Sequence, residues 1–300
     1  MTPLFVGSGV ALVTPFGARG VDTDVLQELV HFHLREGTEA LVVNGSTGEA
    51  ATMSAAEQRL AAEAVIDAVA GRIPVIVGAG GSDTAVVSEL ARSAREAGAD
   101  ALLLSPPPYS KPPAEGVVAH FRAVMDCGQL PTIVYNVPSR TACNVPPALI
   151  ERLAEDERVV GVKEASGDIV QIADLARRVG DRLALYSGND DQVLPVLSLG
   201  GQGVISVLAN VAPAAVSRMV HAFLGGRLDE ARRLQLDYLP LIRALFRESN
   251  PIPVKAAVAA LGFAVGEVRL PLVPLTEEAG AELFACLRER GIHAGEAVHA

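Results

Sequence analysis

The sequence predicts an α/β fold in which eight parallel strands, each followed by a helix, close into a (β/α)8 TIM barrel. Short apolar runs rich in β-branched residues recur eight times along the chain, and an amphipathic stretch follows each run. The runs are apolar almost throughout, as in parallel strands that helices cover on both faces. An open doubly wound sheet also alternates strands with helices, but it rarely needs eight such units.

Each expected element has its own local signal. The strands are predicted over apolar runs at residues 9–14, 40–44, 74–78, 101–104, 132–136, 159–163, 183–187 and 203–207. The helices are predicted where apolar residues recur at intervals of three and four, over residues 23–36, 55–70, 84–97, 115–126, 146–154, 169–179, 192–199 and 213–224. Asp22, Ser54 and Asp83 stand where an N-cap should be, because their side chains can accept from unpaired backbone N–H groups.

The pattern changes after about residue 224. The stretches 228–248, 254–261 and 277–288 all have helical periodicity, and no strand candidate separates them. We therefore expect a catalytic barrel over residues 1–225 and a small all-helical C-terminal domain over residues 226–300. The tail from Gly291 has little apolar surface to bury, so we expect it to be mobile.

Composition narrows the class of protein. The chain has 300 residues, a hydrophobic fraction of 50% and a formal net charge of −10. The chain has no basic cluster, and its net negative charge argues against nucleic acids and anionic membrane surfaces as partners. No apolar run approaches the ~18 residues of a membrane span, and the first residues lack the basic segment of a signal peptide. Three widely spaced cysteines without a CxxC motif indicate a reducing compartment, so we expect a cytoplasmic protein.

Several kinds of cofactor site have no matching motif. The Gly-rich segment 78–83 lacks G-x-G-x-x-G spacing and an acidic partner about 20 residues on, which argues against nicotinamide binding. His31 and His33 are two residues apart on an expected helix, so they face different ways and cannot chelate one metal ion. The sequence has no H-E-x-x-H motif and no nucleophile elbow with a Ser-His-Asp set. We expect neither a metal nor an organic cofactor.

Lysine is scarce in this chain, and one lysine closes an apolar run. Lys111, Lys163 and Lys255 are the three lysines among 25 Lys and Arg residues, and Lys163 ends the run 159–163. A lone ammonium at the end of a buried strand is costly, and burial favours the neutral amine, a nucleophile for carbonyl carbon. A Schiff-base lysine is one interpretation, and a lysine that extends to a solvent-facing carboxylate is the other. This segment alone does not separate the two, whereas Lys111 and Lys255 are expected to be structural or solvated.

Two other motifs follow strands at the end of the barrel where active sites of this fold lie. Strand 40–44 leads into the sequence Asn-Gly-Ser-Thr-Gly-Glu at residues 44–49. Its glycines and N–H groups suit a carboxylate ligand, or simply a tight turn into the next helix. Strand 101–104 leads through three prolines to Tyr109, which on its own is better explained as part of a rigid surface loop.

The next strand carries a phenol and is followed by a guanidinium. Alternation places Ile133, Tyr135 and Val137 on one face, and if this face is the barrel interior, the phenol stands near Lys163. Arg140 can bind a carboxylate through two parallel hydrogen bonds. The plainer alternatives are a core tyrosine with a satisfied hydroxyl and an arginine in a surface ion pair.

The residues beside Lys163 give two further expectations. Gly161 and Ala165 share its face of the strand, and such small neighbours leave room for a ligand around the amine. Glu164 points the other way, toward the helices, so it receives no catalytic role.

Seven motifs, in order along the chain, resemble those of one enzyme family. They are GSTGE, PPPYSKP, YNVPSRT, GVKEASGD, SGND, GGQGVISV and NPIPVK. With these motifs the chain resembles the dihydrodipicolinate synthase (4-hydroxy-tetrahydrodipicolinate synthase) family from essentially end to end. The resemblance implies a TIM barrel with a C-terminal helical domain, a homotetramer built as a dimer of dimers, and no cofactor. It also implies condensation of pyruvate with L-aspartate 4-semialdehyde, a step of diaminopimelate and lysine biosynthesis.

The resemblance implies catalytic roles for four residues. Lys163 matches the lysine that forms a Schiff base with pyruvate, and Tyr135 matches the tyrosine that relays protons to and from that intermediate. Thr47 matches the threonine that links two tyrosines in a proton relay. Tyr109 matches the second tyrosine, which in the family reaches into the neighbouring subunit's site.

It also implies four substrate-binding positions besides Thr47. Arg140 matches the arginine that binds the carboxylate of the semialdehyde. Ser46 stands where many members have a second threonine, and both supply a hydroxyl. Gly188 and Ile205 match backbone positions that line the pyruvate pocket.

One departure from the family concerns regulation. Lysine-inhibited members carry His, Asn, Glu and Tyr around an allosteric lysine pocket, where this chain has Ala55, Gln58, Ser82, Val86 and Pro108. A buried ammonium needs hydrogen-bond acceptors, and the side chains of Val86 and Pro108 offer none. We expect feedback inhibition by lysine to be weak or absent.

Two alternatives to the synthase remain. A sister enzyme on the same scaffold, such as N-acetylneuraminate lyase or a 2-keto-3-deoxy sugar acid aldolase, shares the Schiff-base lysine and the tyrosine but usually lacks the arginine matched by Arg140. A ligand-binding barrel without catalysis would be expected to have lost Lys163, Tyr135 or Thr47, and all three are present.

Overall fold

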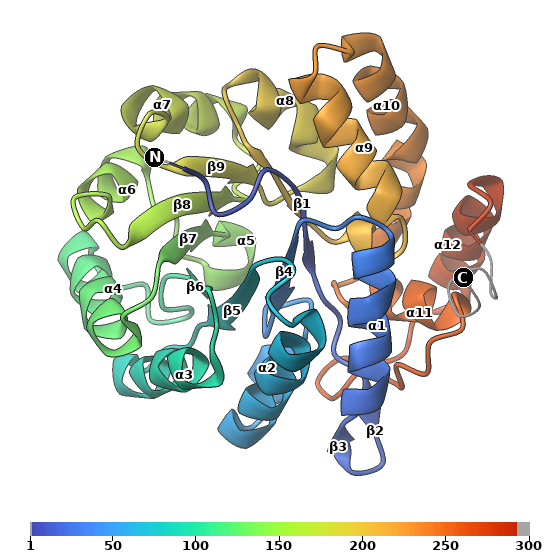
Figure 1. Ribbon diagram of the computed structural model, residues 1–300, viewed down its shortest axis with the longest axis horizontal. Helices are drawn as coiled ribbons and strands as arrows, with labels where there is room; N and C mark the ends of the chain where they lie inside the picture. Colours follow the sequence, from blue (N-terminus) through green and yellow to red (C-terminus); the bar gives the residue numbers. More distant parts are fainter. Residues whose placement is uncertain (1, 293–300) are drawn as a thin grey trace.

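Eight parallel strands form a closed barrel, as the sequence predicts (Figure 1). The computed structural model describes residues 2–292. The barrel strands are β1 (Gly7–Ala11), β4 (Ala40–Val43), β5 (Val75–Ala79), β6 (Ala101–Leu104), β7 (Thr132–Asn136), β8 (Val159–Glu164), β9 (Ala184–Ser187) and β10 (Gly203–Ser206). They neighbour one another in chain order, and β10 pairs with β1 to close the ring. The predicted fold class is confirmed.

The first strand and its exit differ from the prediction. Strand β1 begins and ends earlier than the expected range 9–14, because at Val13 the backbone N–H leaves the ladder and donates to the side chain of Asn210 at 3.2 Å. A hairpin of β2 (Phe16–Gly17) and β3 (Gly20–Val21) follows. The sequence did not predict this hairpin, because strands of two residues are too short to show a periodic pattern.

Helices surround the barrel, and all of them except the short α5 fall on the predicted periodic stretches. They are α1 (Thr23–Arg35), α2 (Ala55–Val69), α3 (Thr84–Ala97), α4 (Ala114–Gly128), α5 (Pro138–Thr141), α6 (Pro147–Leu153), α7 (Ile169–Val179), α8 (Val193–Ser198) and α9 (Pro213–Leu224). Three short 3-10 helices lie at Ala50–Thr52, Asp190–Gln192 and Leu208–Asn210. The predicted N-caps are confirmed, since the side chains of Asp22, Ser54 and Asp83 accept from backbone N–H groups of α1, α2 and α3.

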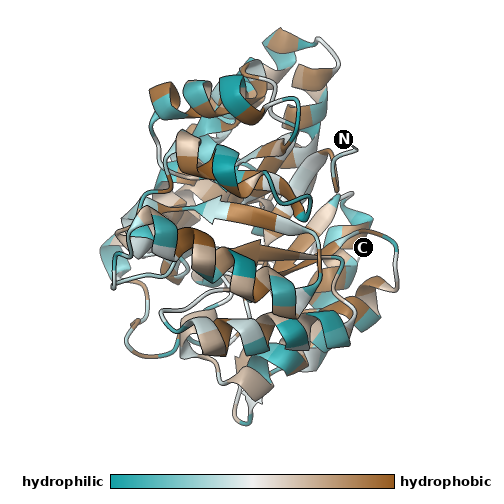
Figure 2. Cartoon of the chain, turned by 90° about the vertical axis from the view of Figure 1, so that its left-hand side faces the viewer, coloured by the Kyte–Doolittle hydropathy of each residue, from teal (hydrophilic) through white to brown (hydrophobic). Residues whose placement is uncertain are grey.

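The barrel interior and the strand–helix interface form two separate apolar layers. Inside the barrel, the ring of Tyr186 stacks on Phe5 with centroids 4.3 Å apart, and its hydroxyl donates to the Phe5 carbonyl at 2.8 Å. Burial raises the pKa of Tyr186 to about 12. The larger layer lies between strands and helices, and Figure 2 shows apolar residues along the central strands with mixed polar and apolar residues on the helices around them. The stacked pair fills the barrel interior toward its N-terminal end.

Three C-terminal helices pack on one side of the barrel (Figure 1). They are α10 (Leu228–Leu245), α11 (Ile252–Ala260) and α12 (Glu277–Glu289). Their buried residues, including Leu241, Val258 and Leu283, belong to the same apolar cluster as the barrel helices. The predicted domain boundary at 225/226 stays a prediction. The expected mobile tail falls largely on residues 293–300, outside the residues that the structure describes, and no helix within residues 2–292 is long and apolar enough to cross a membrane.

Candidate active site

A cavity of about 480 Å³ lies at the C-terminal ends of the barrel strands. The predicted site residues that line it are Ser46, Thr47, Tyr135, Arg140, Lys163 and Gly188. They come from loops and strands that are distant in sequence, and the barrel brings them to one end because all of its strands run in the same direction. Tyr109 and Ile205, the two other predicted residues, are not among its lining residues.

Lys163 extends into this cavity from the end of β8. It is paired in register with Tyr135 on β7 and Tyr186 on β9, and its Nζ atom is 4.3 Å from the centroid of the Tyr135 ring. The residue is only 5% exposed, and no ion pair among residues 2–292 includes it. The structure therefore places Lys163 as a buried amine facing a cavity, and the alternative of a side chain extended to a surface carboxylate is wrong.

A buried carboxylate lies close enough to Lys163 to interact with its charge. Burial raises the pKa of Asp190, while hydrogen bonds from Ser206, Leu208 and Val207 and the charge of Lys163 oppose that rise. The Ser206 hydroxyl donates to it at 2.5 Å, and the backbone N–H groups of Val207 and Leu208 donate at 3.0 and 2.9 Å. The Asp190 carboxyl thus fixes the chain after β10 at the rim of the cavity.

Tyr135 and Thr47 both line the Lys163 cavity. Tyr135 is half-buried on the inner face of β7 next to Ile133, as the alternation predicts. The Thr47 hydroxyl oxygen accepts from the side-chain N–H of Asn250 at 2.9 Å, which leaves its own O–H to donate. Among residues 2–292 no hydrogen bond joins Thr47 to Tyr135 or to Tyr109, so the three hydroxyls do not form a closed chain within one subunit.

Tyr109 lies on the outside of the subunit. It is 91% exposed and its φ of 69° is in the left-handed region, while its backbone N–H donates to the Thr141 carbonyl at 3.3 Å. The side chain of Tyr109 is therefore almost fully open to solvent in this chain.

Arg140 sits on the short helix α5, directly after β7. Its Nη2 atom donates to the backbone carbonyl of Asn250 at 3.1 Å, and the side chain is exposed at the cavity. Since its partner is a backbone carbonyl, the remaining N–H groups can still bind a carboxylate. Among residues 2–292, Arg140 forms no ion pair. The alternative interpretation, an arginine in a surface ion pair, is therefore wrong.

Close packing at the strand ends explains the small residues there. A Cβ atom at Gly188 would come within 2.7 Å of the Ala165 Cβ atom and 3.0 Å of the Glu164 carbonyl, so only glycine fits. A Cβ atom at Gly161 would lie 2.9 Å from the Ala184 carbonyl and 3.4 Å from the Tyr186 ring. The sequence predicted room for a ligand beside both Gly161 and Ala165. Ala165 lines the cavity, so this room exists there, whereas the space beside Gly161 is filled by β9.

Two expectations near the strand ends have different outcomes. Glu164 points away from the barrel interior as predicted, because its carboxylate accepts from Asn136 at 3.0 Å and from the Ser166 N–H at 2.6 Å. Burial raises the pKa of Glu164, and these hydrogen bonds oppose the rise. Ile205 is fully buried inside the barrel on β10, and it is Val207, two residues on, that lines the cavity.

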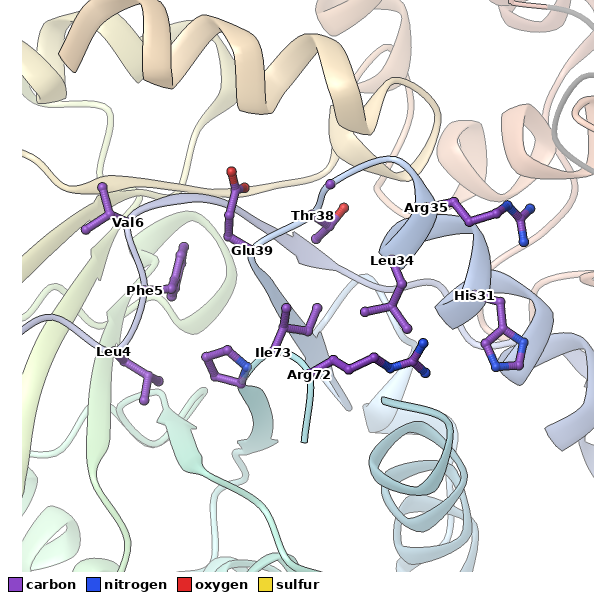
Figure 3. Close-up of a pocket in the computed structure, with 12 residues that line it drawn as sticks. Leu4, Phe5, Val6, His31, Leu34, Arg35, Thr38, Glu39, Arg72 and Ile73 are labelled. Atoms are coloured by element: carbon purple, nitrogen blue, oxygen red, sulfur yellow. The ribbon is translucent and has the colours of Figure 1, made fainter. Parts of the chain in front are cut away.

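A second large cavity lies at the opposite end of the barrel and has a different character. It measures about 830 Å³ and is lined by residues that precede β1, β4 and β5. Figure 3 shows apolar side chains of Leu4, Phe5 and Ile73 near side chains of Arg72 and His31. Its acid, Glu39, accepts from the Ser8 N–H, the Ser217 hydroxyl and His221, each at 2.7 Å. Because catalytic residues of TIM barrels lie at the C-terminal face, the Lys163 cavity is the candidate active site.

Comparison with known proteins identifies the family. A sequence model of the Dihydrodipicolinate synthetase family matches residues 4–290. The chain belongs to this family. A 4-hydroxy-tetrahydrodipicolinate synthase of Thermoanaerobacter sp. (strain X514) is 50% identical over 97% of this chain and 98% of the relative. The resemblance inferred from the motifs is thereby confirmed.

Two solved structures of the family are similar in both sequence and fold. A dihydrodipicolinate synthase from Acinetobacter baumannii, complexed with pyruvate, has a TM-score of 0.92 and 39% identity, with 96% of this chain and 99% of that chain covered. The enzyme from Cyanidioschyzon merolae, with lysine bound, has a TM-score of 0.94 and 39% identity, with 97% and 100% covered.

Four of the five positions compared with the family's lysine pocket lie at or beside a further cavity. It measures about 510 Å³, adjoins the Lys163 cavity through Tyr135 and Arg140, and is lined by Gln58, Val86 and Pro108. Ser82 lies beside it and donates its hydroxyl proton to the Pro108 carbonyl at 3.0 Å.

Sequence reasoning missed one wall of the candidate active site. Residues 246–250, between α10 and α11, line the Lys163 cavity, and Asn250 among them is 6% exposed. Its side-chain oxygen is buried and has no hydrogen-bond partner among the described residues. The motif NPIPVK contains Asn250 and was the signal that could have found it. Lys255 in the same motif is structural, as expected, with its ammonium 2.8 Å from Glu49.

Proposed function

We propose that this chain is a 4-hydroxy-tetrahydrodipicolinate synthase, which condenses pyruvate, bound as a Schiff base to Lys163, with L-aspartate 4-semialdehyde. The observation that carries the proposal is the buried amine of Lys163, 4.3 Å from the Tyr135 ring centroid and facing a cavity of about 480 Å³. Relatives at up to 50% identity bear this enzyme's name, and one solved relative contains pyruvate.

The proposed chemistry starts at the amine. The neutral amine of Lys163 adds to the keto carbon of pyruvate, and loss of water leaves an iminium ion, which is an electron sink. The methyl group then loses a proton to give an enamine, whose carbon attacks the aldehyde of the second substrate. The amino group of that substrate displaces Lys163 by transimination, which closes the ring and restores the free lysine.

The surrounding residues supply proton transfer and substrate binding in this proposal. Tyr135 and Thr47 relay protons to and from the intermediates, an effect typically worth ~10²–10⁴ in rate. Arg140 binds the carboxylate of the semialdehyde with the N–H groups that Asn250 does not use. Ser46, Thr47 and Gly188 shape the pocket for pyruvate. No metal or organic cofactor takes part.

Tyr109 completes the relay from a neighbouring subunit. Its 91% exposure and its absence from the lining of its own cavity fit a role in a partner's site. We infer a homotetramer built as a dimer of dimers, located in the cytoplasm, with diaminopimelate and lysine biosynthesis as its pathway.

Feedback inhibition by lysine is proposed to be weak or absent. Val86 and Pro108 line the cavity next to the Lys163 site, and their side chains cannot accept hydrogen bonds from an ammonium group. Activity measured with increasing L-lysine tests this proposal, and clear inhibition at sub-millimolar concentration would refute it.

The alternative of a sister aldolase acting on N-acetylneuraminate or a 2-keto-3-deoxy sugar acid is less well supported. Arg140 lines the cavity and suits a second carboxylate, which a sugar chain does not require.

Trapping with pyruvate and borohydride tests the proposed function. Reduction should fix a three-carbon adduct on Lys163, and peptide mapping should locate it there and on neither Lys111 nor Lys255. Turnover with both substrate sets then separates the two activities. Cleavage of a sugar acid without condensation of the semialdehyde would overturn the synthase, and absence of any adduct in the wild-type protein would overturn Schiff-base catalysis.

A further inference from the structure

Two pairs of contacts join the loop after β4 to the start of α11. In the first pair, the side-chain N–H of Asn250 donates to the Thr47 hydroxyl oxygen at 2.9 Å. In the second, Lys255 Nζ lies 2.8 Å from Glu49 Oε1. The members of each pair are more than 200 residues apart along the chain, since the separations are 203 and 206. The two contacts therefore hold residues 47–49 against residues 250–255.

The Glu49–Lys255 ion pair is buried, and both of its charged groups make further hydrogen bonds. The side chains of Lys255 and Glu49 are 2% and 0% exposed. The second carboxylate oxygen of Glu49 accepts from the Arg269 N–H at 2.8 Å, and Lys255 also donates to the Glu267 carbonyl at 2.9 Å. The ammonium lies 4.1 Å from the centroid of the Phe16 ring. With this set of partners, the pair has one well-defined geometry.

Neither member of the pair touches the substrate cavities. Glu49 and Lys255 are absent from the lining of the 480 Å³ cavity and of the 510 Å³ cavity beside it. Thr47 and Asn250, by contrast, both line the Lys163 cavity. Any influence of the ion pair on the reaction must therefore pass through the position of its neighbours.

The backbone at Glu49 needs support from its side chain. Its φ of 55° is in the left-handed region, which is costly for a residue other than glycine. Within the turn, the Gly48 and Glu49 N–H groups donate to the carbonyls of Gly45 and Ser46 at 3.1 and 3.2 Å, and the Thr14 hydroxyl donates to the Gly48 carbonyl at 2.7 Å. Thr47 is part of this turn, two residues before Glu49.

From this geometry we propose that the buried Glu49–Lys255 ion pair is a positioning device for the reaction. It fixes the turn that carries Thr47 against the segment that carries Asn250, so that Asn250 orients the Thr47 hydroxyl toward the intermediates on Lys163. Buried ion pairs are weak sources of stability compared with apolar replacements, which fits a role in setting a geometry. The inference rests on the proposed function, because it assigns the pair to the proton relay.

The test replaces both charges at once, because removal of only one would leave a buried unpaired charge. The variant is Glu49→Gln/Lys255→Met, in which the glutamine oxygen can still accept from Arg269. The matched control is Glu151→Gln/Arg178→Met, at an ion pair of 2.8 Å that joins α6 and α7 away from the cavity. Pyruvate trapping, kcat and the KM for pyruvate are measured for both variants and the wild type, each per folded molecule.

The expected result is a change in the rate of turnover without loss of Schiff-base formation. In Glu49→Gln/Lys255→Met we expect kcat to fall about 10- to 100-fold, the scale of a small misplacement of catalytic groups, with KM for pyruvate and the trapped fraction within about twofold. The control variant should stay within about twofold of the wild type in all three. A kcat within twofold of the wild type, or a loss of trapping in proportion to kcat, would overturn the positioning role.

Two further variants keep the inference testable. In a Thr47→Val background the double replacement should cause no further fall in kcat, because the group that it positions is already absent. If the double replacement lowers kcat further in the Thr47→Val background, the ion pair acts on the reaction through a group other than Thr47, and the inference is wrong. If the double replacement does not fold, Lys255→Arg decides: lowered kcat with intact trapping supports the inference, and unchanged kcat refutes it. If the wild type itself fails to trap pyruvate, the proposed function is wrong. This outcome differs from failure of the positioning role, in which the wild type still traps pyruvate.

Discussion

Two lysines are buried in this protein, and they lie in opposite electrostatic surroundings. Lys255 is 2% exposed, and its ammonium has a carboxylate at 2.8 Å, a backbone carbonyl at 2.9 Å and an aromatic ring. Lys163 is 5% exposed and faces a cavity, and within residues 2–292 it takes part in no ion pair. Burial lowers the pKa of Lys255, and the hydrogen bond and charge of Glu49 oppose that fall and hold the ammonium in place. Lys163 has no such carboxylate contact and faces a cavity that a carbonyl compound can enter. Burial alone does not identify a reactive lysine, whereas the set of partners does.

Replacement of Lys163 by methionine tests the reactive half of this comparison. We expect turnover to fall by ~10³-fold or more, because no other described lysine lies in the cavity to form the Schiff base. Stability should not fall, since a buried amine is replaced by an apolar chain of similar length. Steady-state turnover and thermal unfolding measure the two effects. Retained trapping of pyruvate would show that another amine is the nucleophile.

Replacement of Lys255 by methionine tests the structural half. Loss of one partner leaves the Glu49 carboxylate buried without its countercharge, which should lower the free energy of unfolding by about 3–5 kcal/mol. Denaturant unfolding at pH 7 measures this. The surface variant Arg59→Ala, which breaks two exposed ion pairs, with Glu63 and Glu96, is the control and should have a much smaller effect. Equal effects of the two variants would contradict the comparison.

Replacement of Tyr135 by phenylalanine separates the amine from the groups around it. The ring that packs beside Lys163 stays, and only the phenol hydroxyl is lost, so we expect kcat to fall by ~10²-fold while pyruvate is still trapped. Rapid-quench trapping compared with steady-state turnover measures the two steps. An unchanged kcat would remove Tyr135 from the proton relay.

His33 supplies a third buried group, one that is neutral. It is fully buried, its Nδ1 atom is 3.1 Å from the Thr38 hydroxyl, and burial lowers its pKa to about 3 from 6.5. A lowered pKa means that the unfolded chain binds the proton first, so stability is fully present above pH 6.5 and falls by about 1.4 kcal/mol per pH unit below it.

The His33→Gln variant measures this dependence. We expect the wild type to lose about 1.4 kcal/mol more unfolding free energy than the variant between pH 7.5 and 5.5. Denaturant unfolding at the two pH values gives the difference. The same loss in both proteins would show that His33 is charged or accessible in the folded state.

The parts of the structure that follow from local patterns could be predicted from the sequence. The barrel strands are apolar and flanked by capped helices, and Asp22, Ser54 and Asp83 cap them as expected. The gathering of Thr47, Tyr135 and Lys163 also follows from sequence, because parallel strands bring their C-terminal ends to one face.

The parts that depend on contacts between distant segments could not be predicted in the same way. Asn250 reaches Thr47 across 203 residues, and no periodic pattern encodes that contact. The space beside Gly161 is filled by β9 and Tyr186, which only the register of the neighbouring strand reveals. Tyr109 is exposed and does not line the Lys163 cavity, so its role stays a prediction from the motif in which it lies.

The stacked rings of Phe5 and Tyr186 have a consequence for the traffic of small molecules. Because they fill the N-terminal end of the barrel, Lys163 is reached only from the opposite end. Residues 246–250 form part of the wall of the cavity at that end. Changes where the C-terminal helices meet the barrel are therefore expected to alter the access of small molecules to Lys163.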